Sequence, residues 1–161
     1  MTSKFTHLND TGAARMVDVG HKPVSVRSAT AAAVCEMQQS TADAIRDVTS
    51  RKGDVLPVAR IAAINAAKRT DELIPLCHSV PMDRVEVQFD WLGDRQLEIR
   101  VTSQATAKTG VEMEALVGAS IGALTIYDMC KAMDREMTVS RVRVLEKAGG
   151  TRGDFSAPAS A

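Results

Sequence analysis

The sequence predicts an α+β fold in which an antiparallel sheet has its helices packed on one face. Two consecutive segments, 84–92 and 96–108, alternate apolar and polar residues and are separated by a Gly-Asp turn, which is typical of a β-hairpin. Stretches with helical spacing precede and follow this pair, and strand-like segments stand at both ends. The resulting order, β–α–α–β–β–α–β, favours an antiparallel sheet covered on one side.

The N-terminal part of the chain predicts an arm, then strands, then a helix. Residues 1–14 are polar and contain glycine, so we expect a loop or a flexible arm. Segments 16–20 and 21–34 carry alternating β-branched residues, which predicts strands. A first helix is expected from about Ser40, because the Ser-Thr-Ala-Asp run there offers a side-chain oxygen as N-cap.

A second helix is predicted to follow the break at 52–54. Asp54 is the expected N-cap, and Pro57 falls in the first turn, where proline is tolerated. Residues 69–83 contain two prolines and are expected to form a loop that leads into the hairpin.

The C-terminal part predicts a long helix from about Val111 to Met133 and a last strand at 138–147. We expect a single domain over 15–150 and a flexible tail over 151–161, where Gly, Ser, Ala and Pro are frequent. This order of elements is typical of the ferredoxin-like sandwich.

Composition limits the classes of function. The 161 residues suit one domain, and the 20 basic residues equal the 20 acidic ones, which argues against a protein that holds nucleic acid or membrane by its net charge. Aromatic residues make up only 3%, too few for a platform that stacks bases. No apolar run approaches the roughly 18 residues of a membrane span, and no signal segment is evident, so we expect a cytoplasmic protein.

The three cysteines do not form a recognisable metal or disulfide pattern. Cys35, Cys77 and Cys130 are far apart, and no CxxC pair occurs. This spacing suits a reducing compartment and argues against a disulfide framework and against a zinc or iron–sulfur site.

The long helix carries the most informative polar residues. Asp128 and Lys131 stand three positions apart among apolar residues, so their side chains can touch. Spacing alone favours an ordinary ion pair, whereas limited solvent would lower the pKa of the lysine and raise that of the aspartate, which suits proton transfer. Glu112 and Glu114 open the helix, where acids commonly complement the helix dipole. Glu114 shares a face with Asp128 but lies about 20 Å away along the axis.

The same helix has a strip of small residues. They recur at three- and four-residue steps and let another backbone approach closely, although each interior glycine costs roughly 1 kcal/mol of helix stability. The strip is either packed inside the chain or in contact with another subunit. Its members are Ala115, Gly118, Ala119, Gly122 and Ala123.

Two loops and one lysine are further candidates. The loop LIPLCHSVP places Cys77 beside His78, and adjacent side chains on an extended chain point apart, which disfavours a cysteine–histidine nucleophile. A lone loop histidine is more often structural, whereas the two prolines stiffen this loop and favour a functional role for His78. Lys68 falls four residues after Ile64, on or near an apolar face. The stretch 147–154 resembles an anion-binding loop in composition only and matches no Walker pattern.

Four segments that span about Thr6 to Phe155 carry a family resemblance. They are THLNDTGAARMVDVG, KGDVLPVARIAAINAAKRTDELIPLCHSVP, KTGVEMEALVGASIGALTIYDMCKAMD and the closing GDF. Together they closely resemble the molybdenum cofactor biosynthesis protein C family. The resemblance implies a ferredoxin-like lyase of cytosolic cofactor biosynthesis that converts 3′,8-cyclo-7,8-dihydro-GTP to cyclic pyranopterin monophosphate and pyrophosphate. It also implies a homohexamer, a trimer of dimers with active sites at subunit interfaces, and a possible hand-over of substrate from the preceding radical enzyme.

Carried over by position, the resemblance implies an acid–base pair at Asp128 and Lys131. It also implies substrate contacts in the proline-bounded loop and in the first turn of the long helix, and lysines for the triphosphate. These residues are Leu76, Cys77, His78, Met113, Glu114, Lys52, Lys68 and Lys147. Glu112 or Glu114, with the His78 loop, is expected to recognise the guanine-derived donor edge. The family loop reads Leu-Cys-His-Pro, whereas this chain has Ser79 after the histidine, which should loosen the loop slightly.

The implied reaction opens a reduced five-membered ring, closes a pyrazine ring and displaces pyrophosphate by attack of a sugar hydroxyl on the α-phosphorus. These steps move protons without electron transfer, so an adjacent acid and base suffice and no cofactor is required. Lys131 is the expected proton donor, and Asp128 orients it or accepts protons, since a coupled pair titrates jointly. Magnesium can accompany the phosphates, but no carboxylate cluster in the sequence requires a metal site.

Two other classes share the predicted fold. A non-catalytic nucleotide-binding regulatory module would use the cations without needing the Asp128–Lys131 pair. An RNA-recognition module would need an aromatic pattern on its central strands, and segments 84–92 and 96–108 lack that pattern. Turnover of the cyclised nucleotide distinguishes the lyase from both.

Overall fold

A computed structural model of the chain describes residues 7–9, 11–48, 53–151 and 153–158. Nine elements follow one another along this part of the chain. They are β1 (Ser25–Glu36), α1 (Gln39–Arg46), α2 (Val55–Ala67), α3 (Thr70–Leu73), β2 (Arg84–Trp91), β3 (Gln96–Ala107), α4 (Glu112–Cys130), β4 (Thr138–Ala148) and β5 (Phe155–Ser156).

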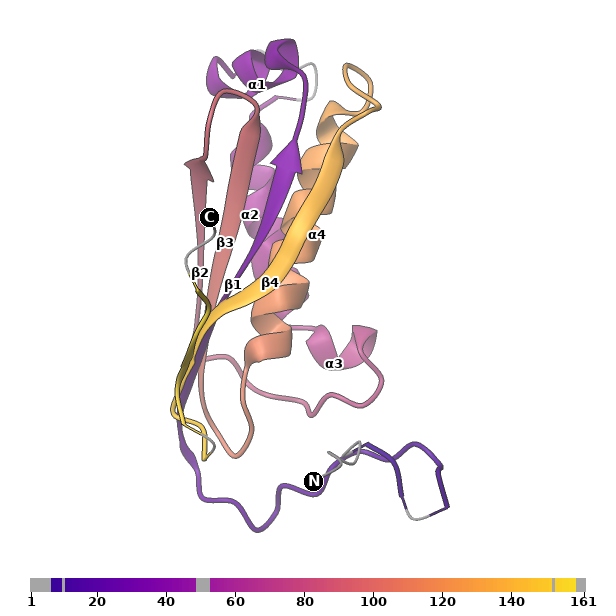
Figure 1. Ribbon diagram of the computed structural model, residues 1–161, viewed down its shortest axis with the longest axis vertical. Coiled ribbons are helices and arrows are strands. Elements are labelled where there is room, and N and C mark those ends of the chain that lie inside the picture. The colour runs from indigo at the N-terminus through magenta and orange to yellow at the C-terminus, as the bar shows by residue number, and fades with distance from the viewer. Residues whose placement is uncertain (1–6, 10, 49–52, 152, 159–161) are drawn as a thin grey trace.

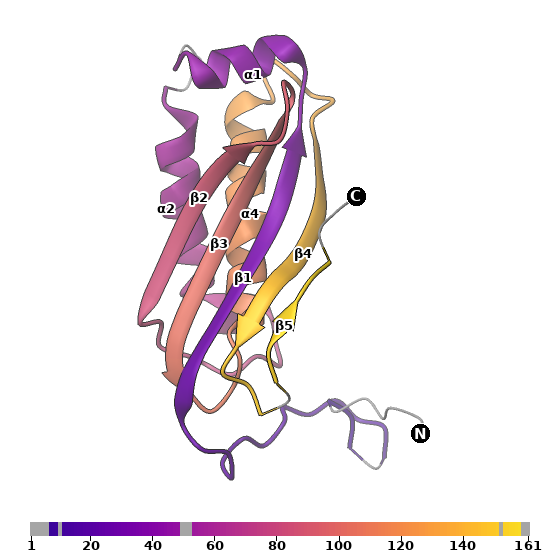
Figure 2. The ribbon, with the colours of Figure 1, turned by 60° about the vertical axis from the view of Figure 1, so that its left-hand side comes forward.

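One antiparallel sheet organises the molecule, with strand order β2-β3-β1-β4-β5. The first four strands therefore have the ferredoxin-like arrangement that the sequence predicts, with β1 and β3 at the centre. Helices α2 and α4 cover one face of the sheet, and α1 lies across one end of it (Figures 1 and 2). The α+β prediction is confirmed.

Small residues let α4 lie close to the sheet and to α2. A Cβ atom added at Gly122 would lie 2.2 Å from Cδ1 of Ile99, and one added at Gly118 would lie 3.2 Å from the carbonyl oxygen of Ala63. The inner face of β1 is equally small, with Ala31 and Ala33 fully buried. The small-residue strip thus packs inside the chain, which decides between the two roles that the sequence allows.

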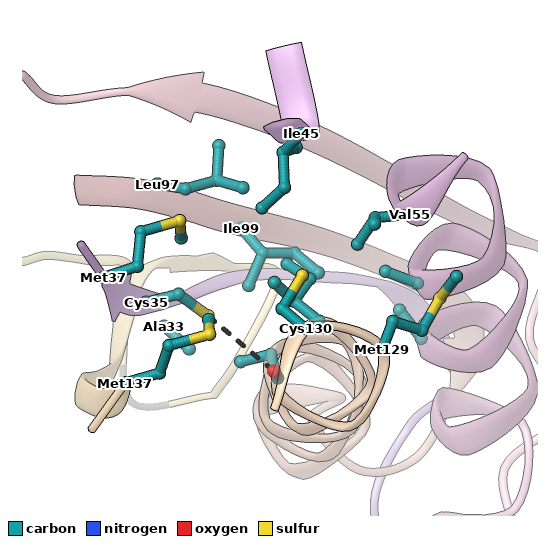
Figure 3. Close-up of a cluster of buried hydrophobic side chains, with 14 of the residues drawn as sticks. Ala33, Cys35, Met37, Ile45, Val55, Leu97, Ile99, Met129, Cys130 and Met137 are labelled. Atoms are coloured by element: carbon teal, nitrogen blue, oxygen red, sulfur yellow. Dashed lines mark hydrogen bonds between the residues drawn. The ribbon is translucent and has the colours of Figure 1, made fainter. Parts of the chain in front are cut away.

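The main core fills the space between the sheet and these two helices, towards the end that α1 covers (Figure 3). Leu97 and Ile99 of β3 are fully buried in it. Cys35 and Cys130 also lie there, and the Cys35 thiol is 3.7 Å from the carbonyl oxygen of Ala123. Burial raises the pKa of the Cys35 thiol to about 12, with a smaller contribution from Cys130, so this cysteine is an inert core residue.

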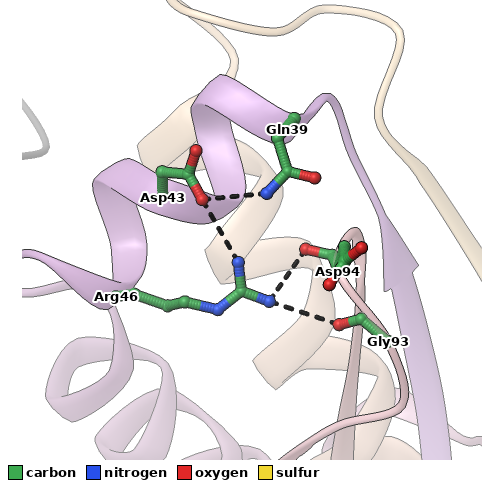
Figure 4. A network of polar contacts seen from close by, with 5 residues as sticks. All are labelled: Gln39, Asp43, Arg46, Gly93 and Asp94. Carbon is green, nitrogen blue, oxygen red and sulfur yellow. Dashed lines mark hydrogen bonds and ion pairs between the residues drawn. The ribbon is translucent and has the colours of Figure 1, made fainter.

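Arg46 joins α1 to the strands at the end of the sheet that α1 covers. The Arg46 guanidinium stacks 3.8 Å from the centre of the Trp91 ring and donates hydrogen bonds to the carbonyl oxygens of Gly93 and Asp94 at 3.2 and 2.8 Å. It also pairs with Asp43 at 3.3 Å (Figure 4). These contacts fix α1 to the turn between β2 and β3.

Several element boundaries differ from the predicted ones. Residues 16–20 form no strand and lie as an irregular segment before β1. The loop predicted over 69–83 contains the short helix α3, and the predicted tail contributes β5. Ser40 is not an N-cap, because α1 begins at Gln39 and its N-cap residue is Gln38. Asp54 is the N-cap residue of α2, as predicted, but its side chain makes no capping hydrogen bond.

α4 passes a test for a membrane-spanning helix by length and composition, with a mean hydropathy of 1.2. More than half of the tested window, 56%, is buried inside the molecule. Its apolar character is therefore that of a core helix.

Candidate functional site

A cavity of about 430 Å³ is lined by the first turn of α4 and by segments that lie at the end of the sheet opposite α1 (Figure 1). The lining residues come from four stretches that are distant in the sequence, within 7–28, 76–78, 108–114 and 147–153. Among the lining residues are His7, Val17, Val19, Lys22, Arg27, Leu76, Cys77, His78, Lys108, Thr109, Glu112, Met113, Glu114, Lys147, Gly150 and Thr151. His7 of the expected arm and Thr151 of the expected tail therefore line the same cavity as residues of the expected domain, 15–150.

The cavity brings together most of the residues that the sequence singles out for substrate contact. The loop residues Leu76, Cys77 and His78, the helix-start residues Glu112, Met113 and Glu114, and Lys147 of β4 all line it. These residues come from three separate elements, so their convergence is a property of the fold and not of local sequence.

Glu114 is the most unusual group in this cavity. The residue is only 4% exposed, and its Oε2 atom has no hydrogen-bond partner among the described residues. Burial raises the pKa of the Glu114 carboxyl to about 7; its own backbone hydrogen bond opposes this, and the charges of Glu112 and Asp71 add to it. A carboxyl group of this kind can both hold and release a proton near neutral pH.

Cys77 lies in the same wall and is half-buried. Its thiol pKa is raised, first by burial and then by the nearby charges of Glu114 and Asp71. A raised pKa keeps the thiol protonated, which agrees with the expectation that Cys77 is no nucleophile.

Four cationic side chains reach the cavity. Lys147 Nζ lies 2.9 Å from Oε1 of Glu112, and Lys108 Nζ donates to the carbonyl oxygen of Gly20 at 3.0 Å. Arg27 is only 4% exposed, and its Nε donates to the carbonyl oxygen of Ala107 at 3.4 Å. With Lys22, these cations outnumber the two acids of the cavity, so the cavity suits an anion.

The glycine-containing loop after β4 forms part of the same wall. Gly149 has φ of 83°, and a Cβ there would lie 1.9 Å from the carbonyl oxygen of Val26, so only glycine fits. The amide of Gly149 donates to Oδ1 of Asp154 at 3.1 Å, and Gly150 faces the cavity. Residues of the 147–154 stretch therefore line the cavity, among them Lys147, Gly150, Thr151 and Gly153.

Asp128 and Lys131 lie at the other end of α4. From Glu114 to Asp128 the helix rises about 21 Å, at 1.5 Å per residue. The two side chains form an ion pair at 2.5 Å and are 58% and 52% exposed. The hydrogen bond to Asp128, more than its charge alone, raises the pKa of Lys131.

The solvent exclusion expected around this pair is therefore wrong for the isolated chain. The apolar neighbours Ile126, Met129 and Cys130 face the core, and the two charged groups face outward. The predicted lowering of the lysine pKa is reversed as well, because a close carboxylate favours the charged ammonium.

One further predicted lysine, Lys68, does not line the cavity of this chain. It is the C-cap residue of α2 and is exposed. Lys52 lies outside the described residues. Arg27, Lys22, His7 and Lys108 also line the cavity, and no sequence pattern described above predicts them as site residues. A signal for Arg27 existed, since it occupies the strand register that Ala29 and Ala31 continue on the buried face.

Comparisons with known proteins place these observations in a family. The model of the MoaC family matches residues 16–150. A cyclic pyranopterin monophosphate synthase of Peptoclostridium acidaminophilum is 47% identical over 152 residues, 94% of this chain and 96% of that protein. Its counterpart in Brevibacillus brevis is 47% identical over 96% of this chain and 97% of its own length. Cyclic pyranopterin monophosphate synthase 3 of Mycobacterium tuberculosis is 51% identical over 94% of this chain and 85% of that protein.

Proposed function

The chain belongs to the MoaC family and is a lyase of molybdenum cofactor biosynthesis, and from this premise we propose how its cavity and its Asp128–Lys131 pair divide the reaction. The substrate is 3′,8-cyclo-7,8-dihydro-GTP, and the products are cyclic pyranopterin monophosphate and pyrophosphate. The observation that carries the proposal is the cavity itself, which holds a proton-labile carboxyl group and an excess of cations.

The cations bind the triphosphate. Lys147, Arg27 and Lys108, with Lys22, lie around one cavity and can neutralise the charge that grows on the departing pyrophosphate. Of the lysines that the sequence suggests for this role, Lys147 is retained. Lys68 does not line the cavity of its own chain, so any contact that it makes with the nucleotide is in the cavity of another subunit.

Glu114 binds the guanine-derived end of the substrate. Its unpartnered Oε2 can accept a hydrogen bond from a ring N–H or an exocyclic amino group, and that bond favours the ionised carboxylate. Glu112 is already paired with Lys147, so it is more suited to holding that lysine in place than to contacting the base.

Asp128 and Lys131 of a neighbouring subunit supply the proton transfers. They lie too far along α4 from Glu114 to reach a substrate in the cavity of the same chain. A homohexamer, built as a trimer of dimers with interface active sites, would bring the pair of one subunit to the cavity of the next. Lys131, whose pKa is raised by Asp128, is then the proton donor, and Asp128 orients it or takes up protons.

The chemistry requires proton movements only. The reduced five-membered ring opens, the pyrazine ring closes, and a sugar hydroxyl attacks the α-phosphorus while pyrophosphate leaves. No electron is gained or lost, so we propose no redox cofactor. Among the described residues, no cluster of three or more His, Cys, Asp or Glu could hold a metal ion. Any Mg²⁺ would therefore be bound mainly through the substrate phosphates.

The proposed setting is the cytoplasm. The substrate is a small anionic nucleotide, and we propose that it is handed over directly by the radical enzyme that makes it. Neither nucleic acid nor membrane is a proposed partner.

The test is turnover of the cyclised nucleotide by the purified chain, with both products measured. Lys131→Ala and Asp128→Ala should each abolish turnover while the oligomer stays folded. Asp43→Ala is the matched control, because it removes another exposed i,i+3 ion pair and should leave the rate unchanged. Near-normal rates for both variants would refute the catalytic assignment, and binding without turnover by the wild type would favour a regulatory module.

A further inference from the structure

We propose that His78 is a positioning residue that holds the segment 17–22 across the cavity, so that this segment, here called the strap, contributes to nucleotide binding. Nε2 of His78 lies 2.7 Å from the carbonyl oxygen of Val17. A carbonyl oxygen can only accept, so Nε2 carries the hydrogen and donates it. The ring nitrogen nearest the strap is thus engaged with the protein's own backbone.

The strap has a second attachment to the cavity wall. Lys108 Nζ donates to the carbonyl oxygen of Gly20 at 3.0 Å. Inside the strap, the amide of Gly20 donates to Oδ1 of Asp18 at 2.7 Å, and the amide of Lys22 donates to the carbonyl oxygen of Val19 at 3.0 Å. The strap belongs to no strand or helix, so no sheet hydrogen bonds hold it in place. The side-chain contacts from His78 and Lys108 hold it instead.

The strap presents one side to the cavity. Val17, Val19 and Lys22 are half-buried and line the cavity, whereas Asp18 and Gly20 between them are exposed. Val17 and Val19 alternate as in an extended chain. The turn over 19–22 then brings Lys22 to the cavity as well, so the strap lines it with two apolar side chains and one ammonium. Loss of the His78 bond would therefore displace both valine side chains and loosen Lys22 together.

The loop that carries His78 is built to hold the ring still. Pro75 and Pro81 restrict its backbone, and the amide of Cys77 donates to the carbonyl oxygen of Ile74 at 3.0 Å. A fixed imidazole that bonds a backbone carbonyl of another segment is suited to fastening that segment. Substrate contact, the role that the family resemblance implies for His78, is then made through the strap.

The first test needs no substrate and so stands apart from the proposed function. Hydrogen exchange of the strap amides is compared in the wild type, His78→Ala and His78→Gln, since glutamine keeps an N–H donor at a similar reach. His78→Ala should speed exchange over 17–22 about tenfold, as loss of one hydrogen bond allows. His78→Gln should stay close to the wild type. Unchanged exchange in His78→Ala, with a normal melting temperature, would overturn the proposal.

The second test is kinetic and rests on the proposed function. His78→Ala should raise KM about tenfold with kcat within about twofold, because the strap binds substrate and transition state alike. His78→Gln should restore KM. Adding Lys22→Met to His78→Ala should raise KM little further, since a loosened strap has already lost that lysine. Additive effects of the two substitutions, or a collapse of kcat that glutamine does not rescue, would show that His78 acts on the substrate directly.

Discussion

Glu114 and Lys131 lie on one helix, and their pKa values are raised for opposite physical reasons. Burial makes the charged form of Glu114 costly, so its pKa rises to about 7. The nearby Asp128 carboxylate makes the charged form of Lys131 favourable, so the pKa of the lysine rises also. Near neutral pH, Glu114 therefore exists in both the protonated and the ionised form, whereas Lys131 stays protonated until it donates its proton in the reaction.

The Glu114 shift predicts how stability depends on pH. Because the folded-state pKa of about 7 is above the ordinary 4.5, the folded state binds more protons between these values, and stability falls as pH rises from about 5 to 7. Glu114→Gln removes this group. The free energy of unfolding of this variant, relative to that of the wild type, should rise by about 1–3 kcal/mol as the pH is raised from 5 to 8.

Denaturant melts at several pH values measure this difference. Glu72→Gln is the matched control, since Glu72 is an exposed glutamate that makes no contribution to the raised pKa of Glu114. A Glu114→Gln difference that stays constant with pH would mean that Glu114 is ionised throughout the range.

At the opposite end of the sheet, Arg46 predicts a purely structural effect. Arg46→Ala removes the stacking on Trp91 and the hydrogen bonds to two carbonyl oxygens, so it should cost about 1–2 kcal/mol. The melting temperature should fall by roughly 2–8 °C. Asp43→Asn keeps these contacts and removes only an exposed ion pair, so its melting temperature should change little. Equal effects of the two substitutions would mean that the ion pair, not the stacking, fastens α1.

At the scale of elements, α4 joins the core and the site. Its small face lets β3 and α2 approach, and its first turn places Glu114 and Met113 in the cavity. The helix itself, the hairpin and the order of the main elements could be predicted from sequence, because each depends on periodicity within a single segment. The short helix α3 and the strap could not, since neighbouring segments hold them and their own sequence pattern is weak.

The close approach at Gly122 makes a prediction about α4. Gly122→Ala should gain about 1 kcal/mol of helix propensity. It should lose more than that by forcing its Cβ against the fully buried Ile99, for a net destabilisation of about 1–3 kcal/mol. Thermal or denaturant unfolding measures the change.

Two variants control this prediction. Gly93→Ala adds a methyl group where no atom lies within 4 Å and should be nearly neutral. Ile99→Val removes the Cδ1 atom that the new methyl group meets, so it should cost less in the Gly122→Ala background than in the wild type. Additive losses in the double variant would contradict the packing argument.

At the scale of the whole molecule, the cavity and the Asp128–Lys131 pair occupy opposite ends of one helix. The separation of Glu114 from the Asp128–Lys131 pair could be predicted from sequence, because the rise per residue of a helix is fixed. The sequence does not show that Arg27, Lys22 and Lys108 line the same cavity as Glu114, since that depends on how the strap, β1 and the loop before α4 meet. The separation itself is the reason to expect that active sites are shared between subunits.

The measurement that tests this account most directly is complementation between two inactive variants. Lys131→Ala leaves the cavity intact, and Lys147→Met leaves the acid–base pair intact. The two variants are co-expressed with different tags and purified as mixed oligomers. They should regain about a quarter of the wild-type turnover of the cyclised nucleotide, because random assembly combines an intact cavity with an intact Lys131 of the partner subunit in about one site in four. Activity no greater than that of the two variants assayed separately would contradict shared active sites and place the whole reaction within one chain.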